Sequence, residues 1–276
     1  HGGADGQALM LGQRILTAVG LVAVLALVLL VLPQPFALAG LGLLILAGAW
    51  EWSLLAGITR PLARAAYLVA CCAAMAGLWK VTGPAVDFER AMVVTMLGWI
   101  PLFAWIVLAP RRGSAWLAAS AGIWALAPTW IALSRLYLQS DRGHELVIFV
   151  LVLAWAADIG AYFAGRRFGR LRLAPTVSPN KTWEGVIGGL VAGLVVAFAA
   201  RAWFDLPAMA FVSLCIAAVL VSVVGDLLES MFKRQRGLKD SGSLLPGHGG
   251  VLDRIDSLTS SVPLLALGLG WLGLVA

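Results

Sequence analysis

Carboxylates gather in one stretch of a chain that is otherwise poor in charge. Asp226, Asp240, Asp253 and Asp256 fall within 31 residues, whereas all 276 residues contain only 14 acidic side chains. Asp226 also precedes Glu229 by three residues, a spacing that places both on one face of a helix. Oxygen ligands of this kind suit Mg²⁺. The alternative interpretation is that these acids form salt bridges with the lysines and arginines of the same stretch.

Basic side chains and a glycine-rich turn accompany these acids. The turn reads Pro-Gly-His-Gly-Gly at 246–250, and its glycines allow the backbone to approach a ligand closely. Successive backbone N–H groups in such a turn can face a phosphate. Cations that neutralise phosphates, beside carboxylates that hold Mg²⁺, indicate metal-assisted phosphoryl or nucleotidyl transfer. The basic members of the stretch that we expect to take part are Lys233, Arg234, Lys239 and Arg254.

The rest of the chain predicts a membrane scaffold for this chemistry. Hydrophobic residues make up 61% of the sequence and charged residues 12%, with a mean hydropathy of +0.92. A soluble domain could not hide that much apolar surface. Disorder is excluded as well, because it requires low hydrophobicity and high charge. We therefore expect an integral membrane protein in which the few polar residues carry the function.

Nine apolar stretches are long enough to cross a hydrocarbon core of about 30 Å. The sequence thus predicts an all-α polytopic fold with about nine transmembrane helices. We interpret residues 1–9 as a tag remnant, 10–142 as about five N-terminal transmembrane helices, and 143–276 as the catalytic transmembrane region. Two polar linkers interrupt that region, at about 166–184 and 229–256. The predicted spans are 14–32, 36–57, 62–79, 91–109, 114–138, 144–165, 185–204, 207–228 and 257–276.

The positive charges predict the orientation of these helices. One set of alternate connections carries 15 lysines and arginines, and the other set carries 5. Because cytoplasmic loops are enriched in these residues, the N-terminus and both polar linkers are predicted to be cytoplasmic and the C-terminus external. Gly185, Gly188, Gly189 and Gly193 form one face of the seventh span, which predicts close contact with another helix.

Glu51 and Asp158 lie inside apolar stretches, where a carboxylate is costly and should face a polar cavity or a cation. Such residues also suit a secondary transporter or an ion channel, which is the alternative function. The concentration of polar residues in two linkers on one side favours chemistry at the membrane interface instead. A non-catalytic scaffold is a further alternative, which the complete polar set disfavours.

Segment 230–256 resembles the signature of the phosphatidate cytidylyltransferases (CDP-diacylglycerol synthases). That signature reads S-x-x-K-R-x-x-x-x-K-D-x-[small]-x-x-[apolar]-P-G-H-G-G-x-x-D-R-x-D, and every fixed position is filled here. Similar blocks occur at 155–165, 178–185 and 225–230. The resemblance is specific over about 150–260 and only general over the first 140 residues. The pattern of the CDP-alcohol phosphotransferases, another family of lipid nucleotide enzymes, is absent.

The resemblance implies transfer of CMP from CTP to phosphatidic acid, which yields CDP-diacylglycerol and pyrophosphate at the cytoplasmic face of the inner membrane. It implies a requirement for Mg²⁺, with a second cation left open, a homodimer, and no nucleic-acid partner. For the metal we expect Asp226 and Asp253 as main ligands, with Asp256 and Asp240 as weaker candidates. The basic residues named above would hold the phosphates of CTP or phosphatidate, and His248 would either donate to the leaving pyrophosphate or only fix its turn. The expected substrate-binding residues are Ser178, Asn180, Lys181, Asp158, Tyr162, Gly249 and Gly250.

Overall fold

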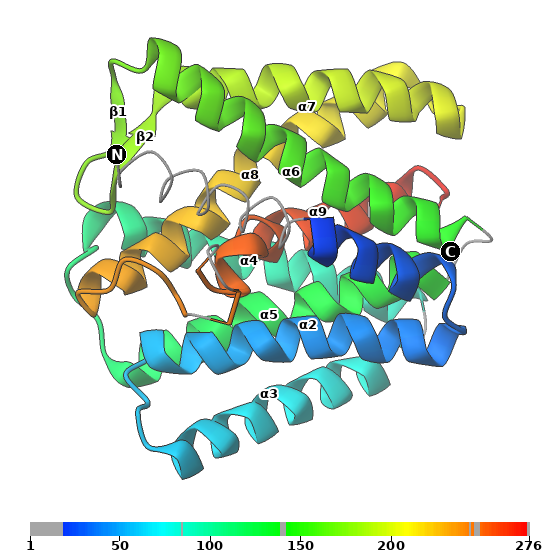
Figure 1. The fold of residues 1–276 in the computed structure, drawn as a ribbon. Helices are drawn as coiled ribbons and strands as arrows, with labels where there is room; N and C mark the ends of the chain where they lie inside the picture. The colour runs from blue at the N-terminus through cyan, green and yellow to red at the C-terminus, as the bar shows by residue number, and fades with distance from the viewer. Residues whose placement is uncertain (1–18, 84, 139–141, 243, 246–248, 275–276) are drawn as a thin grey trace, which may run out of the picture.

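The computed structural model describes residues 19–83, 85–138, 142–242, 244–245 and 249–274, which fold as a bundle of helices lying side by side (Figure 1). Within these residues, seven helices are long and apolar enough to cross a membrane. The polytopic helical fold is therefore confirmed. The seven helices are α2 (Gln34–Leu55), α3 (Pro61–Val81), α4 (Ala85–Leu108), α5 (Ala115–Leu138), α6 (Gly143–Phe168), α7 (Trp183–Phe204) and α8 (Ala208–Gln235).

Two shorter apolar helices, Val19–Leu30 and α9 (Leu258–Trp271), occupy the first and ninth predicted spans. The 14 residues of α9 rise about 21 Å, which is less than the hydrocarbon thickness of about 30 Å. Most of its residues are buried, and it packs against α4, α5 and α8. We predicted a full-length span over 257–276, but this segment forms a short core helix, because its apolar residues pack against other helices.

Prolines and caps fix several helix boundaries. Pro61 lies in the first turn of α3, where the missing N–H of proline costs nothing. The Thr182 hydroxyl caps α7 by accepting a hydrogen bond from the Gly185 N–H at 3.1 Å. Gly57 follows α2 with a φ of +80°, a left-handed conformation that glycine adopts without strain. These boundaries match the predicted breaks between apolar stretches.

Helices α6 and α7 approach each other closely through small residues, and they lie together along one edge of the bundle (Figure 1). A Cβ atom added to Gly188 would lie 2.2 Å from the Ala164 Cβ and 2.7 Å from the Gly160 carbonyl oxygen. Gly185 and Gly189 face the α6 backbone in the same way. The predicted close contact of the glycine face is confirmed.

Replacing Gly188 by alanine should therefore lower the free energy of unfolding by about 1–3 kcal/mol, the usual cost of overpacking a tight contact. Gly77→Ala is the matched control, because no atom lies within 4 Å of a Cβ added to this helical glycine. We expect that control to leave stability unchanged or to raise it by up to about 1 kcal/mol. Thermal unfolding of both purified variants in detergent checks this. Equal melting temperatures for the two variants would show that the contact is not tight.

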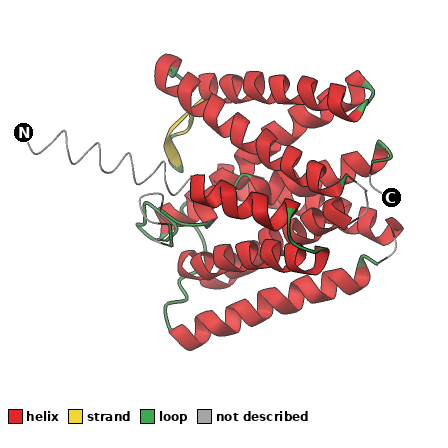
Figure 2. Ribbon diagram, turned by 45° about the vertical axis from the view of Figure 1, so that its right-hand side comes forward, coloured by secondary structure: helices red, strands yellow, loops and turns green. Residues whose placement is uncertain are grey.

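The linker predicted at 166–184 contains an antiparallel hairpin of β1 (Arg172–Ala174) and β2 (Ser178–Thr182), drawn in yellow in Figure 2. The all-α prediction missed it because strands this short, with Pro179 in one of them, show little alternation of apolar and polar residues. The linker predicted at 229–256 is also corrected. Residues 229–235 continue α8, since they are mostly good helix formers, and Gly237 then turns the chain with a φ of +67°.

Connections predicted to share one side of the membrane meet at one end of the bundle. After α8, the Arg236 guanidinium donates to the carbonyl oxygens of Leu55 and Ala56 at 3.0 and 2.8 Å, and Gln235 donates to Pro110 at 2.9 Å. These partners lie at the end of α2 and in the connections that follow α2 and α4. The structure therefore brings together three of the connections that the charge count grouped, including one of the two basic linkers.

Candidate active site

A cavity of about 600 Å³ opens between α6, α7, α8, β2 and the segment that precedes α9. It joins the two polar linkers, because residues of both lie in its wall. The glycine face of α7 contributes Gly185 and Gly189, whose lack of side chains leaves space beside α6. Eight of the residues predicted from the sequence line the cavity, namely Asp158, Tyr162, Asn180, Lys181, Asp226, Asp253, Arg254 and Asp256.

Three carboxylates meet at the wall of this cavity. Asp226, Glu229 and Asp256 each offer one oxygen, and these oxygens all lie within 4.8 Å of one another. Asp226 and Glu229 share one face of α8, as their spacing predicted, and Asp256 comes from the turn before α9. Burial raises the pKa of Asp256 well above its usual value, and the nearby charges of Asp226 and Glu229 raise it further. Three acids gathered in this way call for positive charge between them.

The carboxylate group fits a Mg²⁺ ion. Oxygens bound to one Mg²⁺ lie at most about 4.2 Å apart, because each bond is about 2.1 Å long, so oxygens within 4.8 Å of one another need to approach only slightly to share the ion. Glu229 is fully buried, yet its Oε1 has no hydrogen-bond partner among the described residues. A buried carboxylate oxygen without a donor is costly unless a cation occupies its free side. Asp226 and Asp256 of the cavity wall, with Glu229 buried behind it, are thus the residues that are placed to hold a metal.

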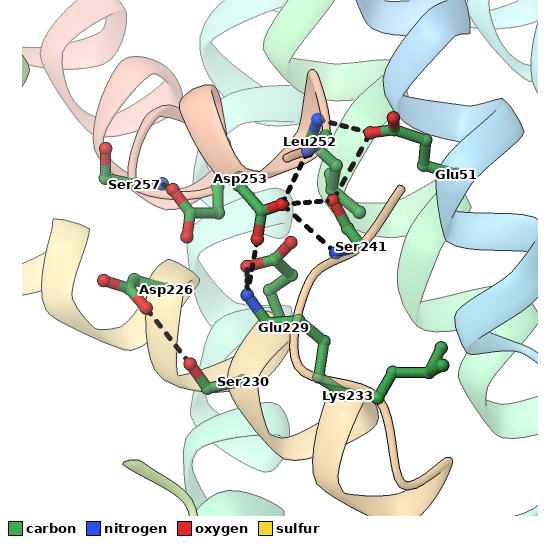
Figure 3. Close-up of polar contacts among 12 residues, drawn as sticks. Glu51, Asp226, Glu229, Ser230, Lys233, Ser241, Leu252, Asp253 and Ser257 are labelled. Atoms are coloured by element: carbon green, nitrogen blue, oxygen red, sulfur yellow. Dashed lines mark hydrogen bonds and ion pairs between the residues drawn. The ribbon is translucent and has the colours of Figure 1, made fainter. Parts of the chain in front are cut away.

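Two lysines lie against these acids. The Lys233 ammonium is 2.7 Å from Glu229 Oε2 and 2.7 Å from Asp253 Oδ1, so it bridges α8 to the following loop (Figure 3). Lys181 of β2 forms an ion pair with Asp226 of α8. The salt-bridge interpretation therefore holds for part of the acidic set. Lys181 also ties the hairpin linker to the carboxylate group, which explains how residues 45 positions apart share one site.

Asp253 is held by the loop around it. Its Oδ2 accepts hydrogen bonds from the Ser241 N–H, the Ser241 hydroxyl and the Gly250 N–H at 3.1, 2.8 and 2.9 Å (Figure 3). Although burial opposes ionisation, Lys233 and these donors keep the pKa of Asp253 below its usual value. Its oxygens are therefore already engaged. The structure groups Glu229, and not Asp253, with Asp226 and Asp256, and the metal role of Asp253 stays a prediction.

Other predicted residues lie away from the cavity wall. Asp240 is exposed and lines a separate hollow near Glu51, which places it outside the carboxylate group. Gly250 donates to Asp253, so its role here is to shape the loop. Gly249 has a φ of +80°, which favours glycine. Ser178, Arg234 and Lys239 do not line the cavity, and His248 lies outside the described residues.

Some residues that build the site were not predicted for it. Glu229 was detectable from its spacing to Asp226 and from its position four residues before Lys233, which suits a helical ion pair. Ser257 donates to Asp158 Oδ2 at 3.1 Å and so orients that intramembrane acid toward the cavity. Ser241 and Glu51 support the loop that holds Asp253. Nothing local in the sequence indicates which partners these last residues have.

Known proteins resemble the chain over most of its length. A profile described as "Cytidylyltransferase family" matches residues 12–271. A phosphatidate cytidylyltransferase of Pseudomonas aeruginosa is 43% identical over 273 residues, which cover 95% of this chain and 99% of the relative. One of Haemophilus influenzae is 41% identical over 280 residues, with 92% and 96% covered. The chain therefore belongs to the cytidylyltransferase family.

Proposed function

We propose that this protein transfers CMP from CTP to phosphatidic acid and releases CDP-diacylglycerol and pyrophosphate. The observation that carries the proposal is the group of Asp226, Glu229 and Asp256, two of them buried, at the wall of a cavity that also presents Lys181 and Arg254. Acids that suit a metal and cations that suit phosphates occur together there. The relatives named phosphatidate cytidylyltransferase supply the identity of the nucleotide and of the lipid.

In the proposed reaction, a phosphate oxygen of phosphatidate attacks the α-phosphorus of CTP. The bond from that phosphorus to the oxygen bridging it to the β-phosphorus breaks, and pyrophosphate leaves with the electron pair. Because the attacking phosphate is already anionic, no strong protein base is needed. The work of the protein is then to position both phosphates and to neutralise their charge.

Different residues at the cavity are proposed to bind the phosphates and to hold the metal. Lys181 and Arg254 line the cavity and would neutralise phosphate oxygens of the two substrates. Asp226, Glu229 and Asp256 would hold Mg²⁺, with a second cation left open. When bound, Mg²⁺ supplies positive charge to the phosphates of CTP and to the leaving pyrophosphate. Lys233 keeps Glu229 and Asp253 in place from behind the wall.

An apolar cavity supports a lipid as the second substrate. It has a volume of about 370 Å³ and is lined mainly by leucine, valine and isoleucine side chains of the helix Val19–Leu30, α2, α6, α9 and the segment before α9. Arg254 lines both this cavity and the polar one. A phosphate held at Arg254 can therefore have CTP on one side and acyl chains on the other.

The proposal also covers the membrane location, orientation and oligomeric state of the enzyme. Its relatives are bacterial, which supports a place in the inner membrane. Since 10 of the 20 lysines and arginines fall in the two linkers that border the cavity, we propose that this end faces the cytoplasm. The family resemblance suggests a homodimer, and no nucleic-acid partner is proposed.

Incubation of the purified protein with CTP and phosphatidic acid tests the proposal. We expect CDP-diacylglycerol and pyrophosphate in equal amounts with Mg²⁺, and loss of both products in excess chelator. Full activity in chelator would contradict the metal assignment alone. Ion flux through proteoliposomes without CTP, together with no lipid product, would favour a transporter or a channel and would overturn the proposed reaction.

A further inference from the structure

Glu51 is a buried carboxylate of α2 that lies next to the active-site loop. Its side chain is 1% exposed, and it comes from a helix of otherwise mostly apolar residues. It does not line the polar cavity described above. The proposed transfer reaction therefore leaves the role of this costly residue unexplained.

The Glu51 carboxylate binds the loop between α8 and α9 at two points. Its Oε2 accepts a hydrogen bond from the Leu252 N–H at 2.8 Å and lies 3.3 Å from the Ser241 hydroxyl, whose single proton it shares with Asp253 Oδ2 (Figure 3). Ser241 precedes the glycine-rich turn, and Leu252 begins the short 3₁₀ helix η1 (Leu252–Arg254) that carries Asp253. One side chain thus contacts the chain before the glycine-rich turn, at Ser241, and after it, at Leu252, and joins both to a helix from the other half of the chain.

The loop is shaped to fit this carboxylate. A Cβ added to Gly242 would lie 2.2 Å from Glu51 Oε1, and one added to Gly250 would lie 2.4 Å from Glu51 Oε2. Neither glycine has a positive φ, so the need here is for space and not for backbone freedom. The approach of the loop to Glu51 explains the glycine at 242, and at 250 it does so together with the Ser241 hydroxyl, whose oxygen would lie 2.1 Å from the added Cβ.

The same loop atoms hold Asp253. Ser241 donates to Asp253 Oδ2 through its N–H and its hydroxyl, and Asp253 in turn binds Lys233, the partner of Glu229. A continuous series of contacts therefore runs from Glu51 through the loop to the carboxylate group. We propose that Glu51 is a positioning residue that fixes the active-site loop, so that Asp253 and Lys233 hold Glu229 in its place. This inference rests on the proposed transfer reaction.

Three substitutions separate positioning from charge. Glu51→Ala removes the acceptor, and Glu51→Asp keeps the charge but shortens the side chain by one methylene. Glu51→Gln keeps an oxygen within reach of both donors and loses the charge. If Glu51 is a positioning residue, Glu51→Ala and Glu51→Asp should lower kcat about 10–100-fold, the usual cost of losing a supporting contact. Glu51→Gln should keep most of the wild-type kcat. The KM for CTP should stay within about twofold, since Glu51 lies outside the cavity wall.

Hydrogen exchange of the protein without substrates supplies a readout that does not depend on activity. Glu51→Ala should speed amide exchange in 241–252 and leave α8 unchanged. The matched control is Ser53→Ala, which removes another buried polar group of α2 whose partners are Trp50 and Arg64. That control should keep both the kcat and the exchange of the loop.

Any one of three results would overturn the proposal. The first is a wild-type kcat and wild-type loop exchange in both Glu51→Ala and Glu51→Asp. The second is a higher activity of Glu51→Asp than of Glu51→Gln, and the third is faster amide exchange throughout α2 and α8. Failure of the transfer reaction itself is distinguishable, because the wild-type protein would then form no CDP-diacylglycerol while the effect on loop exchange could still be measured.

Discussion

Asp226→Asn is expected to lower the rate of CDP-diacylglycerol formation by about 10²–10³-fold, the loss typical of removing one preorganised electrostatic contact. Asp226 is the member of the carboxylate group that lines the cavity on α8 and pairs with Lys181. Asparagine keeps the size of the side chain but removes its charge. The group would then hold Mg²⁺ less well, and Lys181 would lose its ionic partner.

The rate loss should appear without loss of the fold. Asp87→Asn is the matched control, because Asp87 lies on α4 and forms an exposed ion pair with Arg90. Both proteins should purify as folded protein with similar melting temperatures, and the control should keep wild-type activity. Product formation from CTP and phosphatidate measures the rates. Near wild-type activity of Asp226→Asn would remove this residue from the catalytic group.

Lys233→Met should lower the free energy of unfolding by about 3–5 kcal/mol, the usual cost of breaking a buried ion pair. The ammonium lies 2.7 Å from both Glu229 and Asp253, and only 11% of its side chain is exposed. Methionine matches the length of lysine but leaves two buried carboxylates without their cation. Thermal unfolding of the purified variant in detergent measures the effect.

The neighbouring Arg234→Met separates this effect from a general loss of positive charge. Arg234 is exposed, and its guanidinium makes a long 3.5 Å hydrogen bond to the Leu238 carbonyl. Its substitution should change stability by less than about 0.5 kcal/mol. If Lys233→Met were as stable as Arg234→Met, the bridge between Glu229 and Asp253 would contribute nothing to the fold.

Much of the scaffold could be predicted because lipid imposes strong constraints on sequence. Each predicted apolar stretch corresponds to a helix among the described residues, and the glycine face of α7 meets α6 as its spacing indicated. The burial of α9 could not be predicted, because an apolar helix has the same sequence pattern whether lipid or protein surrounds it. The hairpin of β1 and β2 was missed because its strands are too short to show a period.

The candidate site was predicted in its residue types and only partly in its geometry. Asp226 and Glu229 could be placed together, because helical spacing is a local property. The position of Asp256 beside them depends on how the chain returns from α8 to α9. Glu51 lies 190 residues before Ser241, and no local pattern indicates that contact. Sequence patterns within an element therefore predicted neighbours well, whereas contacts between elements required the structure.

The fate of two labels in CTP tests the proposed transfer most directly. Purified protein is given phosphatidic acid and Mg²⁺ with CTP labelled at either the α- or the γ-phosphate. Transfer of CMP predicts that the α-label enters the lipid and the γ-label enters pyrophosphate, and that Asp226→Asn reduces both. A lipid labelled from the γ-phosphate, or no labelled lipid from the folded wild-type protein, would contradict the proposed function.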